Sequence, residues 1–96
     1  MRREDVVNLL ASHRRDLDTL EVRSLSLFGS FARDEAGDDS DVDLLVEFTG
    51  PATLDGYVDL KRYLEDLLGR PVDLVTPKAL KPALRRLIAG DLLRVA

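Results

Sequence analysis

The chain has 96 residues, 45% of them hydrophobic and 33% charged, with a formal net charge of −4 at pH 7 and no cysteine. This length predicts a single domain over residues 1–96, and the negative charge argues against direct binding of nucleic acid, which normally needs a basic face. The lack of cysteine excludes disulfides and thiolate metal sites. Without an apolar run long enough for a signal peptide or a membrane span, we expect a cytoplasmic protein that does not bind membranes.

The first half of the chain predicts a helix, a strand and a helical turn. Residues 4–18 form an amphipathic helix, whose apolar stripe holds Val6, Val7, Leu10 and Leu17. Val22 to Phe28 is a short run of strand type. Ser30 to Arg33 is expected to begin a short helical turn that the Ser30 hydroxyl is free to cap, and residues 34–40 form an acidic loop.

The second half predicts two more strands and two more helices. The alternation over Val42–Phe48 indicates a strand with one apolar face. Residues 54–68 form a helix that ends at Gly69, with apolar positions at Leu54, Val58, Leu60, Leu64, Leu67 and Leu68. A third strand over 71–75 and a helix over 78–89 follow, with Pro82 in the first turn of that helix and a short strand or tail after it. This order of elements is typical of an α/β or α+β domain with a small sheet of three or four strands.

Two aspartates, Asp41 and Asp43, stand at the start of the second predicted strand. Residues two apart on a strand project from the same face, so the two carboxylates lie together and repel each other. A hard divalent cation such as Mg²⁺ relieves that repulsion, and it takes carboxylates and substrate phosphates as ligands. The alternative is an acidic, solvent-facing strand, although aspartate is a poor strand former. Both interpretations stay open at this point.

Further residues belong to the same candidate site. Gly29-Ser30 directly follows an apolar strand, so its backbone can approach a phosphate, or it is an ordinary turn. Asp73 lies on the third predicted strand, where it either joins the first two aspartates or caps a turn. If the three carboxylates converge, they can hold two metal ions about 3.5–4 Å apart. Arg33 pairs either with a phosphate or with Glu35.

Gly29-Ser30, a gap of ten residues, and Asp41-Val42-Asp43 together resemble the nucleotidyltransferase signature of the DNA polymerase β superfamily. The longer strings over 28–33 and 40–46 resemble the minimal nucleotidyltransferase (MNT) group. The turn, the spacing, the carboxylate pair and the later strand aspartate match in order over nearly the whole chain. One departure lies in the loop over 34–37, where a Gly-Glu type of sequence is common, and we expect it to have little effect because that loop is not a ligand.

The resemblance implies the nucleotidyltransferase fold, an α/β (α+β) arrangement in which helices flank a small mixed sheet of three to four strands. It also implies an enzyme that uses two Mg²⁺ ions to transfer AMP from ATP with release of pyrophosphate. Asp41, Asp43 and Asp73 match the catalytic and metal-binding carboxylates, and Asp73 can serve as general base. Gly29 and Ser30 match the turn that contacts the triphosphate, and Arg33 is included in this nucleotide-binding group.

Small MNT proteins are similar to the antitoxins of two-component modules whose partner is a helical HEPN ribonuclease. The resemblance therefore implies ATP and a HEPN-type toxin as partners, with transfer of AMP to a tyrosine hydroxyl of the toxin. Two alternatives stay open, namely an antitoxin that neutralises its toxin by binding alone, and transfer to a small molecule. The set of three carboxylates favours an enzyme, since a pure binding protein has no need of acids that repel one another.

Overall fold

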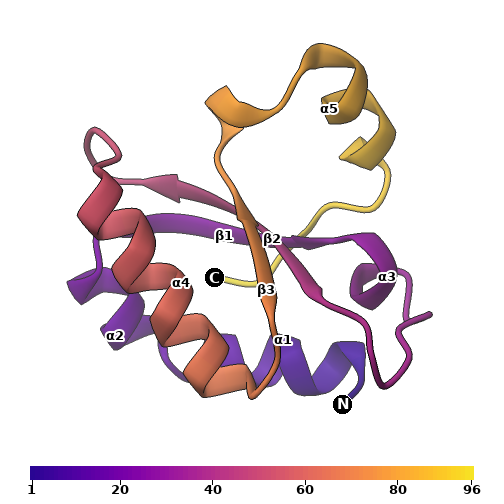
Figure 1. Cartoon of the computed structure of the whole chain (residues 1–96). Coiled ribbons are helices and arrows are strands. Elements are labelled where there is room, and N and C mark those ends of the chain that lie inside the picture. The colour runs from indigo at the N-terminus through magenta and orange to yellow at the C-terminus, as the bar shows by residue number, and fades with distance from the viewer.

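A mixed four-stranded sheet lies at the centre of the computed structural model, which describes all residues from Met1 to Ala96. The strands are β1 (Val22–Phe28), β2 (Val42–Phe48), β3 (Val72–Val75) and β4 (Leu93–Arg94), in the order β3-β2-β1-β4. β1 pairs antiparallel with β2, whereas β2 and β3 run parallel (Figure 1). The short strand β4 pairs antiparallel with the other edge of β1. The expected α/β (α+β) fold with a small mixed sheet is confirmed.

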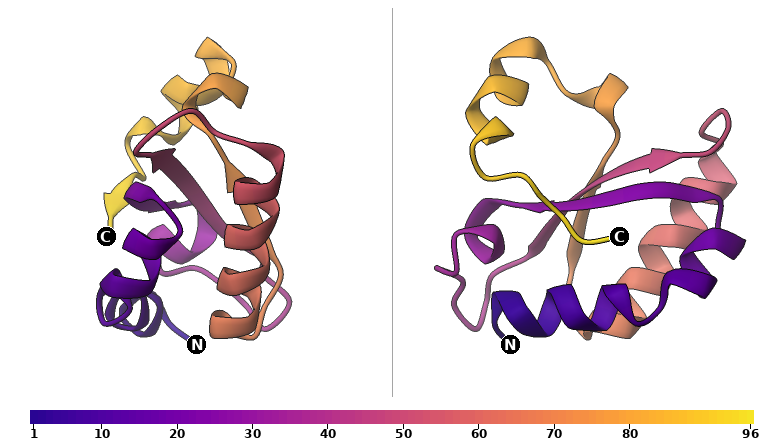
Figure 2. Two further views of the ribbon diagram at one scale, coloured as in Figure 1. Left: turned by 90° about the vertical axis from the view of Figure 1, so that its left-hand side faces the viewer. Right: turned by 180° about the vertical axis from the view of Figure 1, so that it is seen from behind.

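Helices lie on both sides of this sheet. The helices α1 (Arg3–Ala11), α2 (Arg14–Thr19) and α4 (Leu54–Leu68) cover one face, and α5 (Pro82–Ala89) packs on the other (Figure 2). The single-turn helix α3 (Gly29–Ala32) follows β1 directly, and the 3₁₀ helix η1 (Pro77–Ala79) lies between β3 and α5. None of these helices has both the length and the apolar character that crossing a membrane requires.

The alternation along β2 decides which face of the sheet becomes the core. Val42, Leu44 and Val46 are fully buried, and they join apolar residues of α1, α2 and α4 in one cluster of 17 buried residues. Burying each such side chain contributes roughly 1.5–3 kcal/mol to stability. Asp43 and Leu45 project from the opposite face and are only half-buried. The register that buries the valines and leucine therefore holds the Asp43 carboxylate outside the main core.

A smaller apolar cluster lies on that opposite face. It consists of Phe28, Leu80 and Ile88, with Leu45 and Val75 packed against it. Ile88 belongs to α5, so this contact attaches α5 to the sheet. Phe28 pairs with Asp43 across the β1–β2 ladder. The cluster consequently lies beside the acidic end of β2.

Helix α4 spans the predicted residues and ends at Gly69, whose φ of 65° is in the left-handed region that glycine adopts readily. The predicted apolar stripe was wrong at its N-terminal end, because Leu54 is 78% and Val58 is 39% exposed. The buried stripe runs through Leu60, Leu64 and Leu68. At about 100° per residue, Val58 lies on nearly the opposite side of the helix from Leu60, which explains its exposure.

The single helix predicted over residues 4–18 is in fact two helices, α1 and α2. The Ser12 hydroxyl donates a hydrogen bond of 2.9 Å to the Leu9 carbonyl oxygen, and Nδ1 of His13 lies 2.7 Å from the same oxygen. The His13 N–H bonds instead to the Leu10 carbonyl, at 3.1 Å. Side chains that compete for backbone carbonyls in this way interrupt a helical hydrogen-bond series.

Two smaller predictions about the helices need correction. The helix expected over 78–89 is divided into η1 and α5, because Lys81, which precedes Pro82, adopts an extended conformation with ψ of 150°. Pro82 does occupy the first turn of α5, as predicted. The Ser30 hydroxyl does not cap α3, because that helix begins one residue earlier, at Gly29, and has no side-chain cap.

Candidate active site

Asp43 and Asp73 occupy paired positions on the neighbouring parallel strands β2 and β3. Paired residues on adjacent strands project from the same face, with backbones about 4.7–4.9 Å apart, so the two carboxylates lie side by side. Asp43 is half-buried, and Asp73 is exposed. Asp41 is exposed just before β2 begins and lies near enough to Asp43 to act on its charge. The register thus places Asp43 and Asp73 together on one face of the sheet, and Asp41 lies nearby, just before β2 begins.

Burial, and then the neighbouring negative charges, alter the pKa of Asp43. Burial raises the pKa of Asp43 above its ordinary value, and the nearby carboxylates of Asp73 and Asp41 raise the pKa further. The guanidinium of Arg33 acts in the opposite direction and lowers the pKa of Asp43, but it does not cancel the rise. The net effect is a carboxylate whose negative charge is disfavoured in the free protein and would be stabilised by an added cation.

The raised pKa of Asp43 predicts a pH-dependent stability difference. A carboxyl whose pKa is higher in the folded than in the unfolded state stabilises the fold below the unfolded pKa, and this contribution is lost as pH rises through the folded pKa. We therefore expect Asp43→Asn to be more stable than the unaltered protein at pH 7, with the gain disappearing below the ordinary aspartate pKa. Urea unfolding of both proteins over a pH series in EDTA measures this difference in unfolding free energy. Asp59→Asn, at an exposed position of α4, is the reference, and a gain independent of pH would contradict the assignment.

Gly29 sits against the Asp43 carboxylate. Its φ is 73°, in the left-handed region, and a Cβ built on it would lie 2.1 Å from Oδ2 of Asp43. The cross-strand pairing of Phe28 with Asp43 explains this approach, because Gly29 is the next residue after Phe28. Ser30 follows and is half-buried. A Cβ at position 29 would force the Asp43 carboxylate to rotate away, and the left-handed φ separately favours glycine.

Arg33 is held near Asp43 by two other carboxylates. Its Nη1 donates to Oδ2 of Asp91 at 2.7 Å, and its Nε donates to Oε2 of Glu35 at 3.1 Å. Both hydrogen bonds raise the pKa of Arg33 above its ordinary value, so the guanidinium stays charged. The predicted pairing with Glu35 is therefore present. Nη2 of Arg33 makes no hydrogen bond within the chain and keeps its donors available.

Two residues near the candidate site were not indicated by the sequence. Asp91 pairs with Arg33 across 58 positions of the chain, and no local pattern marks that contact. Arg70 contacts the loop before Asp41, and the one sequence signal for it is its position between the helix-ending Gly69 and the strand that carries Asp73. The partners of Asp91 and Arg70 lie far away in the sequence, so these contacts become apparent only in the folded structure.

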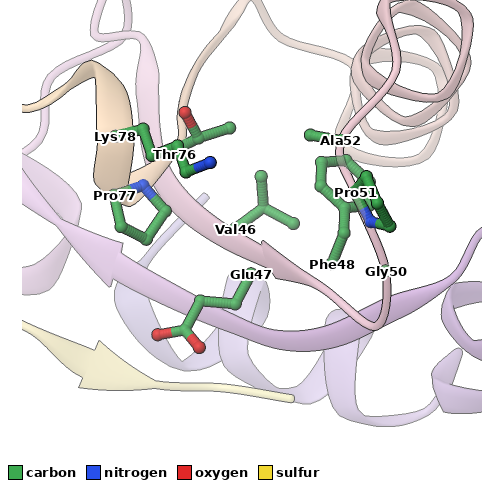
Figure 3. Close-up of a pocket in the computed structure, with 9 residues that line it drawn as sticks. All are labelled: Val46, Glu47, Phe48, Gly50, Pro51, Ala52, Thr76, Pro77 and Lys78. Atoms are coloured by element: carbon green, nitrogen blue, oxygen red, sulfur yellow. The ribbon is translucent and has the colours of Figure 1, made fainter.

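The three carboxylates do not form a complete metal-binding set by themselves, since no group of three or more His, Cys, Asp or Glu side chains is arranged to hold an ion. A pocket of about 470 Å³ lies elsewhere, at the far ends of β2 and β3 (Figure 3). Its lining residues are Val46, Glu47, Phe48, Gly50, Pro51, Ala52, Thr76, Pro77 and Lys78. None of these is a candidate site residue, so the three carboxylates and this pocket are separate features.

The sequence as a whole decides the family. A family model for the nucleotidyltransferase domain matches residues 10–94. The chain belongs to this family. The matched range includes the Gly29-Ser30 turn, the strands β2 and β3 that carry Asp43 and Asp73, and every other candidate site residue described above. The nucleotidyltransferase fold expected from the resemblance is thereby established together with the class of enzyme.

Individual relatives place this nucleotidyltransferase more closely. The protein adenylyltransferase MntA of Thermococcus cleftensis is 38% identical over 93 residues, which are 96% of this chain and 94% of MntA. The solved structure of a protein assigned as a minimal nucleotidyltransferase has a TM-score of 0.83 at 35% identity, covering 97% of this chain and 95% of that one. This nucleotidyltransferase is therefore one of the minimal, MntA-like protein adenylyltransferases.

A more distant structure shares the fold. It is the MNT antitoxin in complex with a tri-AMPylated HEPN toxin of Shewanella oneidensis, with a TM-score of 0.66 and 18% identity, covering 94% of this chain and 71% of that one. At this identity the likeness shows the arrangement of helices and strands.

Proposed function

We propose that this nucleotidyltransferase transfers AMP from ATP to a tyrosine hydroxyl of a HEPN-type ribonuclease toxin and acts in the cytoplasm as the antitoxin. The likeness to MntA of Thermococcus cleftensis over almost the full length of both chains supports a protein acceptor. The fold shared with an MNT antitoxin bound to an AMPylated HEPN toxin supports the choice of partner.

The observation that carries the proposal is the register of Asp43 against Asp73, with Gly29 packed on the Asp43 carboxylate. Hard oxygen donors placed side by side suit Mg²⁺, which is commonly held by one or two carboxylates together with substrate phosphates. An incomplete protein ligand set fits that coordination, because triphosphate oxygens supply the remaining ligands. In the proposed complex, Asp41, Asp43 and Asp73 would hold two Mg²⁺ ions only together with the triphosphate oxygens.

Each candidate residue has a distinct part in this proposal. Bound Mg²⁺ would neutralise charge on the triphosphate and on the departing pyrophosphate. Gly29 and Ser30 contact the triphosphate through the turn that begins α3, and Arg33 has Nη2 free to donate to a phosphate oxygen. Asp73, exposed beside Asp43, is open to an acceptor arriving from solvent. It takes the acceptor's proton as the hydroxyl oxygen attacks the α-phosphorus and the bond to the β-phosphate breaks.

We expect AMP transfer to require a divalent cation. Incubation of the protein with ATP, Mg²⁺ and a HEPN-type ribonuclease toxin should add the mass of one or more AMP groups to that toxin. In EDTA the transfer should vanish, since the carboxylates then face the triphosphate without a bridging cation. Intact-mass spectrometry of both proteins gives the measurement. Restoration by excess Mg²⁺ is the control, and transfer that persists in EDTA would exclude this mechanism.

A further inference from the structure

Arg70 links three separate segments of the candidate site with one side chain. It lies between α4, which ends at Leu68 and is capped by Gly69, and β3, which carries Asp73. Its guanidinium carbon is 5.3 Å from the centre of the Phe31 ring, in α3. Its Nη1 donates hydrogen bonds to main-chain carbonyls of the loop that leads to Asp41. The distances are 3.0 Å to Asp38, and 3.3 Å to both Gly37 and Ser40.

These contacts reach every segment that delivers a candidate residue. Phe31 follows Gly29-Ser30 in α3, and the loop over 37–40 leads into Asp41 and Asp43. The loop also closes on itself, because the Gly37 N–H donates to Oγ of Ser40 at 2.9 Å. Next to Arg70, the Pro71 carbonyl accepts the Val42 N–H at 3.0 Å, which extends the pairing of β2 with β3.

We propose that Arg70 is a positioning residue for nucleotidyl transfer. It fixes the loop over 37–40 and α3 against the start of β3, so that Asp41 and Asp43 are held beside Asp73. This inference rests on the proposed function for the meaning of the site, although the contacts themselves do not depend on it. None of these contacts involves the carboxylates directly, so Arg70 acts on them through the backbone.

The chemistry of arginine suits this task. A planar guanidinium stacks on an aromatic ring while its N–H groups donate in the plane, and a cation strengthens hydrogen bonds to carbonyl oxygens. Lysine offers one ammonium group that cannot stack in the same way. The guanidinium also lines the same hollow as Asp38 and Asp39, in the loop that leads to Asp41.

A purely structural role for Arg70 makes different predictions from a positioning role. Arg70 is half-buried and lies outside the cluster of 17 buried residues that forms the main core. Its loss should therefore loosen the loop over 37–43 locally without lowering the stability of the whole chain. If Arg70 only stabilised the fold, its removal would lower global stability and leave the metal dependence of transfer unchanged.

The test compares Arg70→Met and Arg70→Lys with Arg62→Met, which alters an exposed arginine of α4. In the metal-free protein, we expect Arg70→Met to raise the rate of amide hydrogen exchange over residues 37–43 at least tenfold. The denaturant midpoint of unfolding should be the same for Arg70→Met as for Arg62→Met. In the transfer assay, the Mg²⁺ concentration for half-maximal rate should rise about tenfold with the KM for the acceptor protein unchanged. Arg70→Lys should fall between Arg70→Met and the unaltered protein.

Unchanged exchange over 37–43, or an unchanged Mg²⁺ requirement in Arg70→Met, would overturn the inference. A uniform loss of stability with a normal Mg²⁺ requirement would do the same. If the unaltered protein transfers no AMP at all, the proposed function fails separately. Calorimetric binding of Mn²⁺ then decides the inference, with weaker binding expected in Arg70→Met and an affinity equal to that of Arg62→Met contradicting it.

Discussion

Replacing Asp41 and Asp43 together by asparagine should abolish AMP transfer while leaving the fold intact. Metal-assisted stabilisation of the transition state contributes several kcal/mol, and each 1.4 kcal/mol or so is a factor of ten in rate, so we expect a loss of about a thousandfold or more. The folded protein should be as stable as before or more stable, because two of the three carboxylates that raise one another's energy are removed. Intact-mass measurement of AMP on the HEPN-type partner, beside urea unfolding, gives both quantities.

The same double substitution separates modification from masking. A covalent AMP group persists after the two proteins dissociate, so a modifying antitoxin protects cells at low antitoxin-to-toxin ratio and loses this protection with the two aspartates. An antitoxin that acts by binding alone protects cells only when it is present in about the same amount as the toxin, and its protection tolerates the substitutions. Co-expression of toxin and antitoxin at graded ratios distinguishes these outcomes. If the Asp41→Asn, Asp43→Asn double variant still protects cells, but only at an antitoxin-to-toxin ratio of about one to one, masking is favoured.

Much of this fold could be predicted because its elements obey simple periodicities. The alternation in β2 buries Val42, Leu44 and Val46 and leaves Asp43 on the opposite face, as the sequence pattern indicates. The end of α4 at Gly69 also follows from a local rule, since a left-handed residue there favours glycine. The same pattern could not give the register between β2 and β3, which depends on how α4 carries the chain back to the sheet.

What the sequence did not predict depends on contacts between distant segments. The pairing of Arg33 with Asp91 and the reach of Arg70 to the loop over 37–40 have no periodic signature. The division of the first helix at Ser12 and His13 comes from side chains that compete for one carbonyl, which a hydrophobic stripe does not reveal. The aspartates themselves were indicated by their spacing, whereas the tight packing of Gly29 on Asp43 required the folded structure.

Gly29→Ala is expected to lower the rate of AMP transfer about a hundredfold or more, because the added methyl group would displace the Asp43 carboxylate. Its Cβ would lie 2.1 Å from Oδ2 of Asp43, so the carboxylate must rotate away. The backbone of Asp43 is fixed, because Val42 and Leu44 on either side of it are fully buried. A misplacement of about 1 Å in an active site can lower the rate about a hundredfold. Transfer measured by intact mass at saturating Mg-ATP checks this expectation.

Gly69→Ala is the matched control for the backbone strain in that variant. Gly69 has a φ of 65°, close to the 73° of Gly29, yet a Cβ there meets nothing within 4 Å. Both alanine variants should therefore lose about 1–2 kcal/mol of stability from the left-handed conformation. Gly29→Ala alone carries the additional clash with Asp43. Full transfer by Gly69→Ala, combined with loss in Gly29→Ala, would attribute the defect to the carboxylate rather than to strain.

A double-mutant cycle in unfolding free energy measures the contact between a side chain at position 29 and the Asp43 carboxylate. With Asp43→Ala, the carboxylate that Gly29→Ala would strike is absent, so adding Gly29→Ala should then destabilise the protein only as much as Gly69→Ala does. In the presence of Asp43, the same substitution should be more destabilising, and the difference is the energy of the contact between position 29 and the carboxylate. Equal effects of Gly29→Ala in both backgrounds would mean that the carboxylate moves freely aside. In that case the glycine is required by its backbone conformation or by the phosphate it approaches, and not by Asp43.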